Sequence, residues 1–240
     1  MISALHHATR QVLEPFELAT EPMADVEATL NAIDPKLPVF IASLASELEL
    51  TPAEWRLRSV SVLLMFAATQ LADDLADGDC DYLPDAGRRG PGTEWLLHQL
   101  SGALMLESSV ERGTILACLT DLTQVGASQA LEVRRSQWDL ASSRAAAIGL
   151  NGKQWSSYLR LLADGTSHAA RAPAWGEAWG SALHVAGDRT SQDRRFSSLS
   201  PADQTALTDW ALKRLDDLAD TNLKTLRRSA VWFRAVLQRP

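Results

Sequence analysis

The chain has 240 residues, enough for one large domain or two small ones, and a net charge of −7 with a pI near 5.2. This acidic balance gives no general attraction to nucleic acid or to anionic lipid, so we expect neither as a partner. No apolar run that could span a bilayer and no signal peptide is evident, and Cys80 and Cys118 lack metal-ligand spacing, which together favour a cytoplasmic protein with free thiols.

Apolar residues recur at helical spacing along nearly the whole chain, and alternating strand patterns are almost absent. We therefore predict an all-α fold in a single domain over residues 1–240. The expected helices span residues 2–18, 23–33, 38–48, 52–78, 92–108, 110–147, 152–165, 173–190 and 201–235.

Local signals mark several of these boundaries. Thr51-Pro52-Ala53-Glu54 predicts a capping box with proline in the first turn, and Ser200-Pro201 predicts a second helix start. The Gly- and Pro-rich segment 87–92 predicts a loop, and the polar segment 191–200 predicts irregular structure.

The helix predicted over 52–78 ends in a cluster of carboxylates. Asp73, Asp74, Asp77 and Asp79 follow the apolar run 60–71. Asp73 and Asp77 are four residues apart, so on a helix they share one face with Cβ atoms about 5–6 Å apart. This spacing suits Mg²⁺, which takes one or two carboxylates and fills its octahedron with water and substrate phosphate. We predict a catalytic Mg²⁺ site at Asp73 and Asp77, with Asp74 as a further ligand; a solvated acidic helix end is the alternative.

Two arginines follow this acidic cluster. Arg88 and Arg89 have the planar guanidinium groups that bind phosphate oxygens in a bidentate way. Next to a Mg²⁺ site they predict a diphosphate-binding segment. A basic surface loop is the alternative.

The combination of Asp-Asp-x-x-Asp-Gly-Asp and Arg-Arg-Gly-Pro resembles the polyprenyl synthetase family, the trans-isoprenyl diphosphate synthases. The segment 136–140, which contains Gln137, and the segment 175–188 resemble later family segments in the same order. The resemblance implies an isoprenoid synthase-type helical bundle around a central apolar cavity. It also implies a homodimer, an allylic prenyl diphosphate substrate bound partly through Gln137, and two acidic motifs that face each other.

The second acidic motif departs from the family pattern. Its register reads Gly187-Asp188-Arg189-Thr190-Ser191, so two of three carboxylates are absent. Terpene cyclases use an Asn-Asp-x-x-Ser-x-x-x-Glu pattern, which Ser191 fits and which Gly187 and Arg195 do not. Asp188 and Ser191 are the candidate metal ligands on this side, with Asp193 nearby.

The expected isopentenyl diphosphate site is also reduced. The family's Gly-Lys-Arg-Leu-Arg-Pro segment falls near residues 34–38, where only Lys36 remains as a cation. The chain thus resembles a degenerate family member, similar to the short branch that includes the moenomycin-pathway prenyltransferase and no longer elongates chains.

The resemblance also suggests pocket residues. Thr69 lies four residues before the first aspartate, where the family sets the tunnel floor, and Phe66 lies two helical turns from Asp73 on the same face. Ala68, five residues before the first aspartate, is the second floor position, and the absence of bulk at Thr69 and Ala68 would leave room for a C15 chain or longer, or would simply permit close helix packing. Trp179, in the segment before the second motif, would face the cavity and stabilise carbocations; core packing is the alternative.

Three hypotheses of function remain open. The leading one is a Mg²⁺-dependent prenyltransferase or terpenoid synthase-like enzyme that ionises an allylic prenyl diphosphate, with an acceptor other than isopentenyl diphosphate. The second is an ordinary chain-elongating synthase. The third is a non-catalytic partner subunit of a prenyl synthase.

Overall fold

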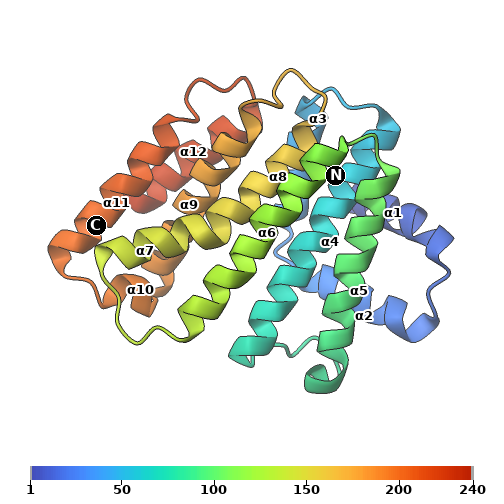
Figure 1. Ribbon diagram of the computed structural model, residues 1–240, viewed down its shortest axis with the longest axis horizontal. Helices are drawn as coiled ribbons and strands as arrows, with labels where there is room; N and C mark the ends of the chain where they lie inside the picture. The colour runs from blue at the N-terminus through green and yellow to red at the C-terminus, as the bar shows by residue number, and fades with distance from the viewer. Residues whose placement is uncertain (1, 239–240) are drawn as a thin grey trace. The chain divides into compact units, whose positions relative to one another are not determined.

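The computed structural model describes residues 2–238, and this part of the chain contains α-helices, two short helical turns of other types and no β-strand (Figure 1). The all-α prediction is confirmed. The backbone forms two compact units, one ending at Val110 and one beginning at Glu111. The single domain and the central apolar cavity expected from the sequence stay predictions.

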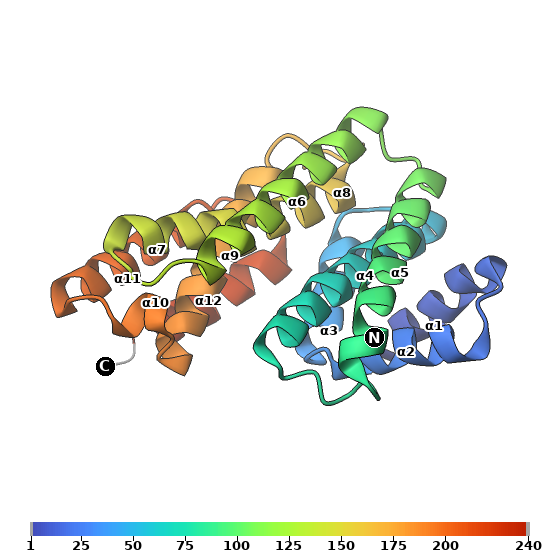
Figure 2. The same cartoon turned by 60° about the horizontal axis from the view of Figure 1, so that its bottom comes forward.

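Unit 1 contains five α-helices among its described residues. They are α1 (Ile2–Leu13), α2 (Thr20–Ala32), α3 (Lys36–Glu47), α4 (Pro52–Asp77) and α5 (Ala86–Glu107), with a 3₁₀ turn at Glu14–Phe16. The helices α4 and α5 lie side by side and antiparallel in both views (Figures 1 and 2). Their contact is polar at one point, where the hydroxyl groups of Ser61 and Ser101 lie 3.0 Å apart.

Helix α4 is the core helix of unit 1, and its residues Val60 to Met65 are all buried. No membrane span is expected from the sequence, yet α4 is by length and composition alone long and apolar enough to cross a membrane. Within the protein, 56% of its most apolar window is buried. Packing inside the fold therefore accounts for the apolar character of α4.

Unit 2 contains the remaining helices. They are α6 (Arg112–Val133), α7 (Leu140–Ala147), α8 (Lys153–Ala163), α9 (Ala172–Ser191), α10 (Arg194–Ser197), α11 (Pro201–Asp216) and α12 (Lys224–Leu237), with a π-helical turn at Ile148–Gly152. Helix α9 packs closely on α8. A Cβ added at Gly176 would lie 2.2 Å from the Trp155 carbonyl oxygen, and one at Gly180 would lie 2.1 Å from the Asn151 carbonyl oxygen.

The predicted helix starts are mostly correct. Thr51 Oγ1 accepts a hydrogen bond from the Glu54 N–H, and Ser200 Oγ accepts one from the Asp203 N–H. Glu54 does not complete the capping box, because its carboxylate binds the Ser109 N–H and the guanidinium of the buried Arg58. Tertiary contacts of the Glu54 carboxylate therefore replace its expected hydrogen bond to the Thr51 N–H.

Several segments predicted from the sequence differ in the structure, among them the helix 2–18, which ends at Leu13 and is followed by the 3₁₀ turn. Segment 87–92 lies inside α5, segment 110–147 breaks after Val133, segment 201–235 breaks after Asp216, and segment 191–200 contains the short helix α10. The difference at segment 87–92 has a physical cause: Gly90 packs under Leu75 of α4, so tertiary packing overrides the poor helix propensity of glycine.

Candidate functional site

The carboxylates at the acidic end of α4 differ from one another in exposure and in hydrogen bonding. Asp73 and Asp77 are exposed, and the Asp77 side chain has no hydrogen-bond or ion-pair partner among the described residues. Asp74 is half-buried, and its carboxylate accepts hydrogen bonds from Gln70 Nε2 at 2.7 Å and from the Tyr82 hydroxyl at 2.8 Å. The helix ends at Gly78, whose φ of 80° lies in the left-handed region.

The two arginines lie in the first turn of α5, close to this acidic end. A Cβ at Gly90 would meet Leu75 Cδ2 at 2.6 Å, so the glycine lets α5 approach α4 closely. The last turn of α4 and the first turn of α5 are also joined by a short loop (Figure 2). The structure thus brings the acidic and the basic motif together.

Arg88 and Arg89 have different surroundings. Arg88 is exposed, and no ion pair joins it to a described residue. Arg89 pairs with the buried Asp25 of α2: its Nε donates to Oδ2 at 3.0 Å, and its Nη2 contacts Oδ1. Only Arg88 therefore presents a guanidinium without a protein carboxylate bound to it.

Helix dipoles reinforce the charge pattern at this end of unit 1. The C-terminal end of α4 carries partial negative charge and favours a cation, whereas the N-terminal end of α5 carries partial positive charge and favours an anion. Among the described residues, no three His, Cys, Asp or Glu side chains are grouped so that they could hold a metal ion alone. Asp73 and Asp77 fit Mg²⁺ only as a site completed by water and phosphate oxygens, which is how Mg²⁺ is usually bound.

The end of α9 holds a second acidic cluster, built around an arginine. Arg195 Nε lies 3.1 Å from each carboxyl oxygen of Asp188, and its Nη2 lies 2.9 Å from Asp188 Oδ1. The same guanidinium contacts Glu132 of α6 through Nη1 and Asp193 through Nε at 3.2 Å. Asp188 is therefore already bound to a permanent cation.

A buried histidine lies next to this cluster. His184 Nε2 is 3.4 Å from Asp188 Oδ2, and its Nδ1 is 3.1 Å from Asn151 Oδ1. Burial lowers the pKa of His184 to about 4, so the imidazole is neutral at pH 7. Burial also raises the pKa of Asp188, and the negative charge of Asp193 adds to that rise, while the bound Arg195 opposes it.

Ser191 does not join Asp188 in a ligand set. Its side chain is exposed, and its hydroxyl donates to the Gly187 carbonyl oxygen at 2.9 Å. The structure therefore brings Asp188 together with Glu132 and Arg195, and not with Ser191 as the sequence pattern suggested.

The other predicted substrate-binding residues are dispersed. Lys36 is 90% exposed and lies 3.9 Å from Asp34, and Gln137 is exposed in the segment between α6 and α7. Phe66 and Thr69 are half-buried on α4, with the Thr69 hydroxyl donating to the Phe66 carbonyl oxygen at 2.9 Å.

Trp179 lies in an aromatic cluster of unit 2. Its ring is 4.3 Å from that of Trp155 and 5.3 Å from that of Phe233, both in edge contacts, and its Nε1 donates to Ser229 Oγ at 2.7 Å. These contacts match the packing alternative for this residue.

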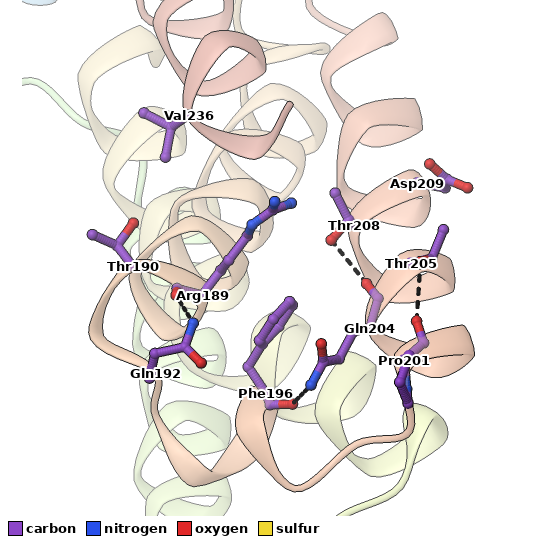
Figure 3. A pocket seen from close by; sticks show the side chains of 10 residues that line it. All are labelled: Arg189, Thr190, Gln192, Phe196, Pro201, Gln204, Thr205, Thr208, Asp209 and Val236. Atoms are coloured by element: carbon purple, nitrogen blue, oxygen red, sulfur yellow. Dashed lines mark hydrogen bonds between the residues drawn. The ribbon is translucent and has the colours of Figure 1, made fainter. Parts of the chain in front are cut away.

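A cavity of about 580 Å³ opens near the C-terminal end of α9 (Figure 3). Its lining residues are Arg189, Thr190, Gln192, Phe196, Pro201, Gln204, Thr205, Thr208, Asp209 and Val236. Several of its polar groups are already bonded: Arg189 Nη1 donates to the Leu237 carbonyl oxygen, and Gln204 Nε2 donates to the Phe196 carbonyl oxygen. The cavity contains none of the site residues predicted from the sequence.

Sequence reasoning missed the residues that bind the side chains of the predicted motifs. Asp25, Tyr82 and Glu132 bind motif residues, yet Asp25 and Arg89 are 64 positions apart. In the sequence Arg195 is visible only as a departure from the terpene cyclase pattern. The signal available was the presence of a cation at a position expected to hold a carboxylate.

Comparisons with known proteins identify solved structures with the same fold. No protein-family model matches the chain, and no curated protein matches it in sequence. A geranyltransferase structure from Legionella pneumophila has a TM-score of 0.72 and 11% identity, covering 99% of this chain and 95% of that chain. An isoprenoid synthase family member from Thermotoga neapolitana has a TM-score of 0.72 and 15% identity, with coverage of 97% and 98%. A geranylgeranyl pyrophosphate synthase from Lactobacillus brevis has a TM-score of 0.69 and 13% identity, with coverage of 98% and 96%.

These likenesses define the class of fold. The chain has the all-α fold of isoprenoid synthases, as the sequence predicted. At 11–15% identity the comparison carries the fold alone.

Proposed function

We propose that this protein is a Mg²⁺-dependent enzyme that ionises an allylic prenyl diphosphate and passes the cation to an acceptor other than isopentenyl diphosphate, or cyclises it. One observation carries the proposal. Exposed carboxylates at the end of α4 lie near an exposed arginine in the first turn of α5, in a fold shared with a geranyltransferase and a geranylgeranyl pyrophosphate synthase.

The residues of unit 1 have distinct roles in this proposal. Asp73 and Asp77 hold the metal, and Asp74 is oriented by Gln70 and Tyr82 beside them. Bound Mg²⁺ supplies charge neutralisation for the departing diphosphate, which is worth several kcal/mol in the transition state. Arg88 binds the diphosphate oxygens from the α5 side.

Arg89 takes a second role in the same step. Its guanidinium is bound to Asp25, so a diphosphate must compete with that carboxylate to reach it. We assign Arg89 to diphosphate binding only after this pair opens, and Arg88 to the first contact.

The prenyl chain would extend along α4 past Thr69 and Phe66. The proposal assigns the small residues Ala68 and Thr69 to the floor of the prenyl-chain site, which would admit a C15 chain or longer. In the same proposal the protein is cytoplasmic and forms a homodimer, and light scattering of the purified chain tests the dimer.

Isopentenyl diphosphate is excluded as the acceptor because the segment expected to bind it contains a single cation, Lys36. A second diphosphate beside the first needs several cationic side chains, each contributing about 1.5–3 kcal/mol through charge-assisted hydrogen bonds. Lys36 is 90% exposed and is the single cation in the segment 34–38, so binding should be weaker by orders of magnitude.

Two other functions have support of their own. The names of the structural neighbours favour chain elongation, since they include a geranylgeranyl pyrophosphate synthase. The arginine bound to Asp188 favours a non-catalytic partner subunit, since a permanent cation occupies the second acidic cluster.

One assay separates the three functions. The protein is incubated with Mg²⁺ and C10, C15 or C20 allylic diphosphates, with and without isopentenyl diphosphate, and pyrophosphate and prenyl products are measured. We expect little elongated product. Pyrophosphate release from the allylic substrate alone supports a cyclase, and release only after addition of a cell extract indicates a missing acceptor. Efficient elongation at micromolar isopentenyl diphosphate would restore the plain synthase, and no release under any condition would favour the partner subunit.

A further inference from the structure

A single guanidinium group contacts three carboxyl groups in unit 2. Arg195 reaches Asp188 through Nε and Nη2, Glu132 through Nη1 and Asp193 through Nε. These residues come from α6, α9 and the start of α10, so the arginine joins three elements. We refer to Glu132, Asp188, Asp193 and Arg195 as the Arg195 cluster.

Burial makes the positive charge of this cluster necessary. The side chains of Glu132 and Asp188 are only 9% and 7% exposed, and that of Asp193 is 32% exposed. Two buried carboxylates without a cation would be costly to desolvate. Among the described residues, the neighbouring His184 does not supply that charge, because burial keeps its imidazole neutral.

We propose that Arg195 is the resident cation of this cluster and stands in the place of a divalent metal, so that Asp188 and Ser191 do not bind Mg²⁺. Both Asp188 oxygens accept hydrogen bonds from the guanidinium, so a metal could bind there only by displacing it. Arginine keeps its charge at all accessible pH values and donates from several N–H groups in a fixed plane. The consequence rests on the proposed function: the metal that accompanies the diphosphate binds at Asp73 and Asp77 alone.

The remaining polar atoms do not require a metal either. Glu132 Oε2 is buried without a hydrogen-bond partner, and Glu132 borders a cavity of about 80 Å³ that Ser128, Trp138 and Ser142 also line. The Trp138 Nε1–H is likewise buried without a partner. A cavity of this size is large enough for water, which would satisfy both atoms.

The test measures thermal unfolding without any diphosphate. The intact chain, Arg195→Gln and Arg194→Gln are each melted in EDTA and in millimolar Mn²⁺. Arg194 is the matched control, because it is exposed on the same short helix and forms no ion pair with a described residue.

The proposal makes a distinct expectation for each chain. The intact protein and Arg194→Gln should have the same melting temperature in EDTA and in Mn²⁺. Arg195→Gln should melt roughly 5–15 °C lower in EDTA, because breaking a buried ion pair leaves uncompensated charge. Mn²⁺ should restore part of that loss, because the carboxylates are then open to a metal.

Two results would overturn the proposal. One is an Arg195→Gln variant that melts like the intact protein. The other is an intact protein that Mn²⁺ stabilises, where Asp188→Asn removes the stabilisation and Asp73→Asn leaves it.

If Arg195→Gln does not fold, a second measurement decides. Bound Mn²⁺ is counted by electron paramagnetic resonance in the presence of pyrophosphate, for the intact protein and for Asp188→Asn. Equal counts above zero support the proposal, and a lower count in Asp188→Asn contradicts it. Failure of the proposed function gives a different result, because then pyrophosphate induces no Mn²⁺ binding in either protein, while melting of the intact protein in EDTA and in Mn²⁺ still tests whether a metal binds at Asp188.

Discussion

Asp73 and Asp77 at the end of α4 are exposed, whereas Asp188 at the end of α9 is buried against Arg195. Both ends are C-terminal ends of long helices, so both carry the same sign of dipole charge. The difference therefore lies in how each cluster is neutralised. At α9 an arginine of the chain neutralises the carboxylates, whereas at α4 the exposed Asp77 has no ion-pair partner among the described residues.

This contrast is most sharply tested by removing one carboxylate from each end. Asp73→Asn should lower pyrophosphate release from an allylic diphosphate by roughly 10²–10⁴-fold, because it removes a metal ligand that neutralises the leaving group. Asp188→Asn should change the rate by less than about threefold, because its carboxylate serves the Arg195 cluster. A steady-state pyrophosphate assay compares both.

Asp81→Asn is the control for the first substitution, because Asp81 is exposed in the loop that follows the acidic end of α4. Equal losses in Asp73→Asn and Asp188→Asn would remove the distinction between the two ends. A large loss in Asp81→Asn would attribute the effect to general surface charge.

Glycine-to-alanine substitutions test the helix packing beside the end of α4 and along α9. At Gly180 the new Cβ would lie 2.1 Å from a backbone carbonyl oxygen, whereas at Gly90 it would lie 2.6 Å from the end of the flexible Leu75 side chain. Alanine gains about 1 kcal/mol of helix propensity at either site. Overpacking against rigid backbone should outweigh this at Gly180, for a net loss of about 2 kcal/mol, and Gly90→Ala should stay within about 1 kcal/mol of the native protein.

Urea unfolding of both variants measures these free energies. An exposed reference is Gly113→Ala on α6, where a Cβ meets nothing within 4 Å. If Gly180→Ala were as stable as Gly113→Ala, the close approach of α9 to the π-helical turn would be wrong.

The sequence predicted one of these two ends better than the other. Helical periodicity and the Asp-x-x-x-Asp spacing gave the end of α4 and the shared face of Asp73 and Asp77, because both are local properties of the chain. The neighbourhood of Arg88 was predicted too, although as a loop, since the packing of Gly90 against Leu75 is not visible in a local pattern.

The end of α9 could not be predicted in the same way. Arg195 is close to Asp188 in sequence, but its partner Glu132 lies on another helix, and nothing local links the two. The same holds for Asp25, which is buried because α2 packs against α4 and α5, and which meets Arg89 on α5. Long-range ion pairs depend on which helices meet, so a single sequence shows the charges and not their pairing.

The buried histidine gives the α9 end a pH dependence of stability. The pKa of His184 is lowered by burial from 6.5 to about 4, so the unfolded chain takes up a proton more readily than the folded one. Its stabilising contribution is therefore complete above pH 6.5 and is lost as the pH falls toward 4. Between pH 7.5 and pH 5 the intact protein should lose about 2 kcal/mol relative to His184→Asn.

Urea unfolding at several pH values measures this difference, and His7→Asn, at an exposed position, is the control. Parallel pH profiles for the intact protein and His184→Asn would show that the histidine is not buried in its neutral form. A profile that instead rises toward acid pH would indicate that protonation of Asp188 dominates this end.

The smallest expected effect concerns Arg89, in the first turn of α5, which forms an ion pair with Asp25 of α2. Its guanidinium is bound to Asp25, so a diphosphate that recruits Arg89 must first displace that carboxylate. Asp25→Asn weakens the competitor and should tighten Mg²⁺-dependent pyrophosphate binding by roughly two- to fivefold, about 0.5–1 kcal/mol. Isothermal titration of pyrophosphate in Mg²⁺ measures this shift.

Glu27→Gln is the matched control, because Glu27 lies on the same helix as Asp25 and pairs with the exposed Arg10 instead. Weaker binding in Asp25→Asn would mean that the pair positions Arg89 for the ligand rather than withholding it, and an unchanged affinity would assign diphosphate binding to Arg88 without Arg89.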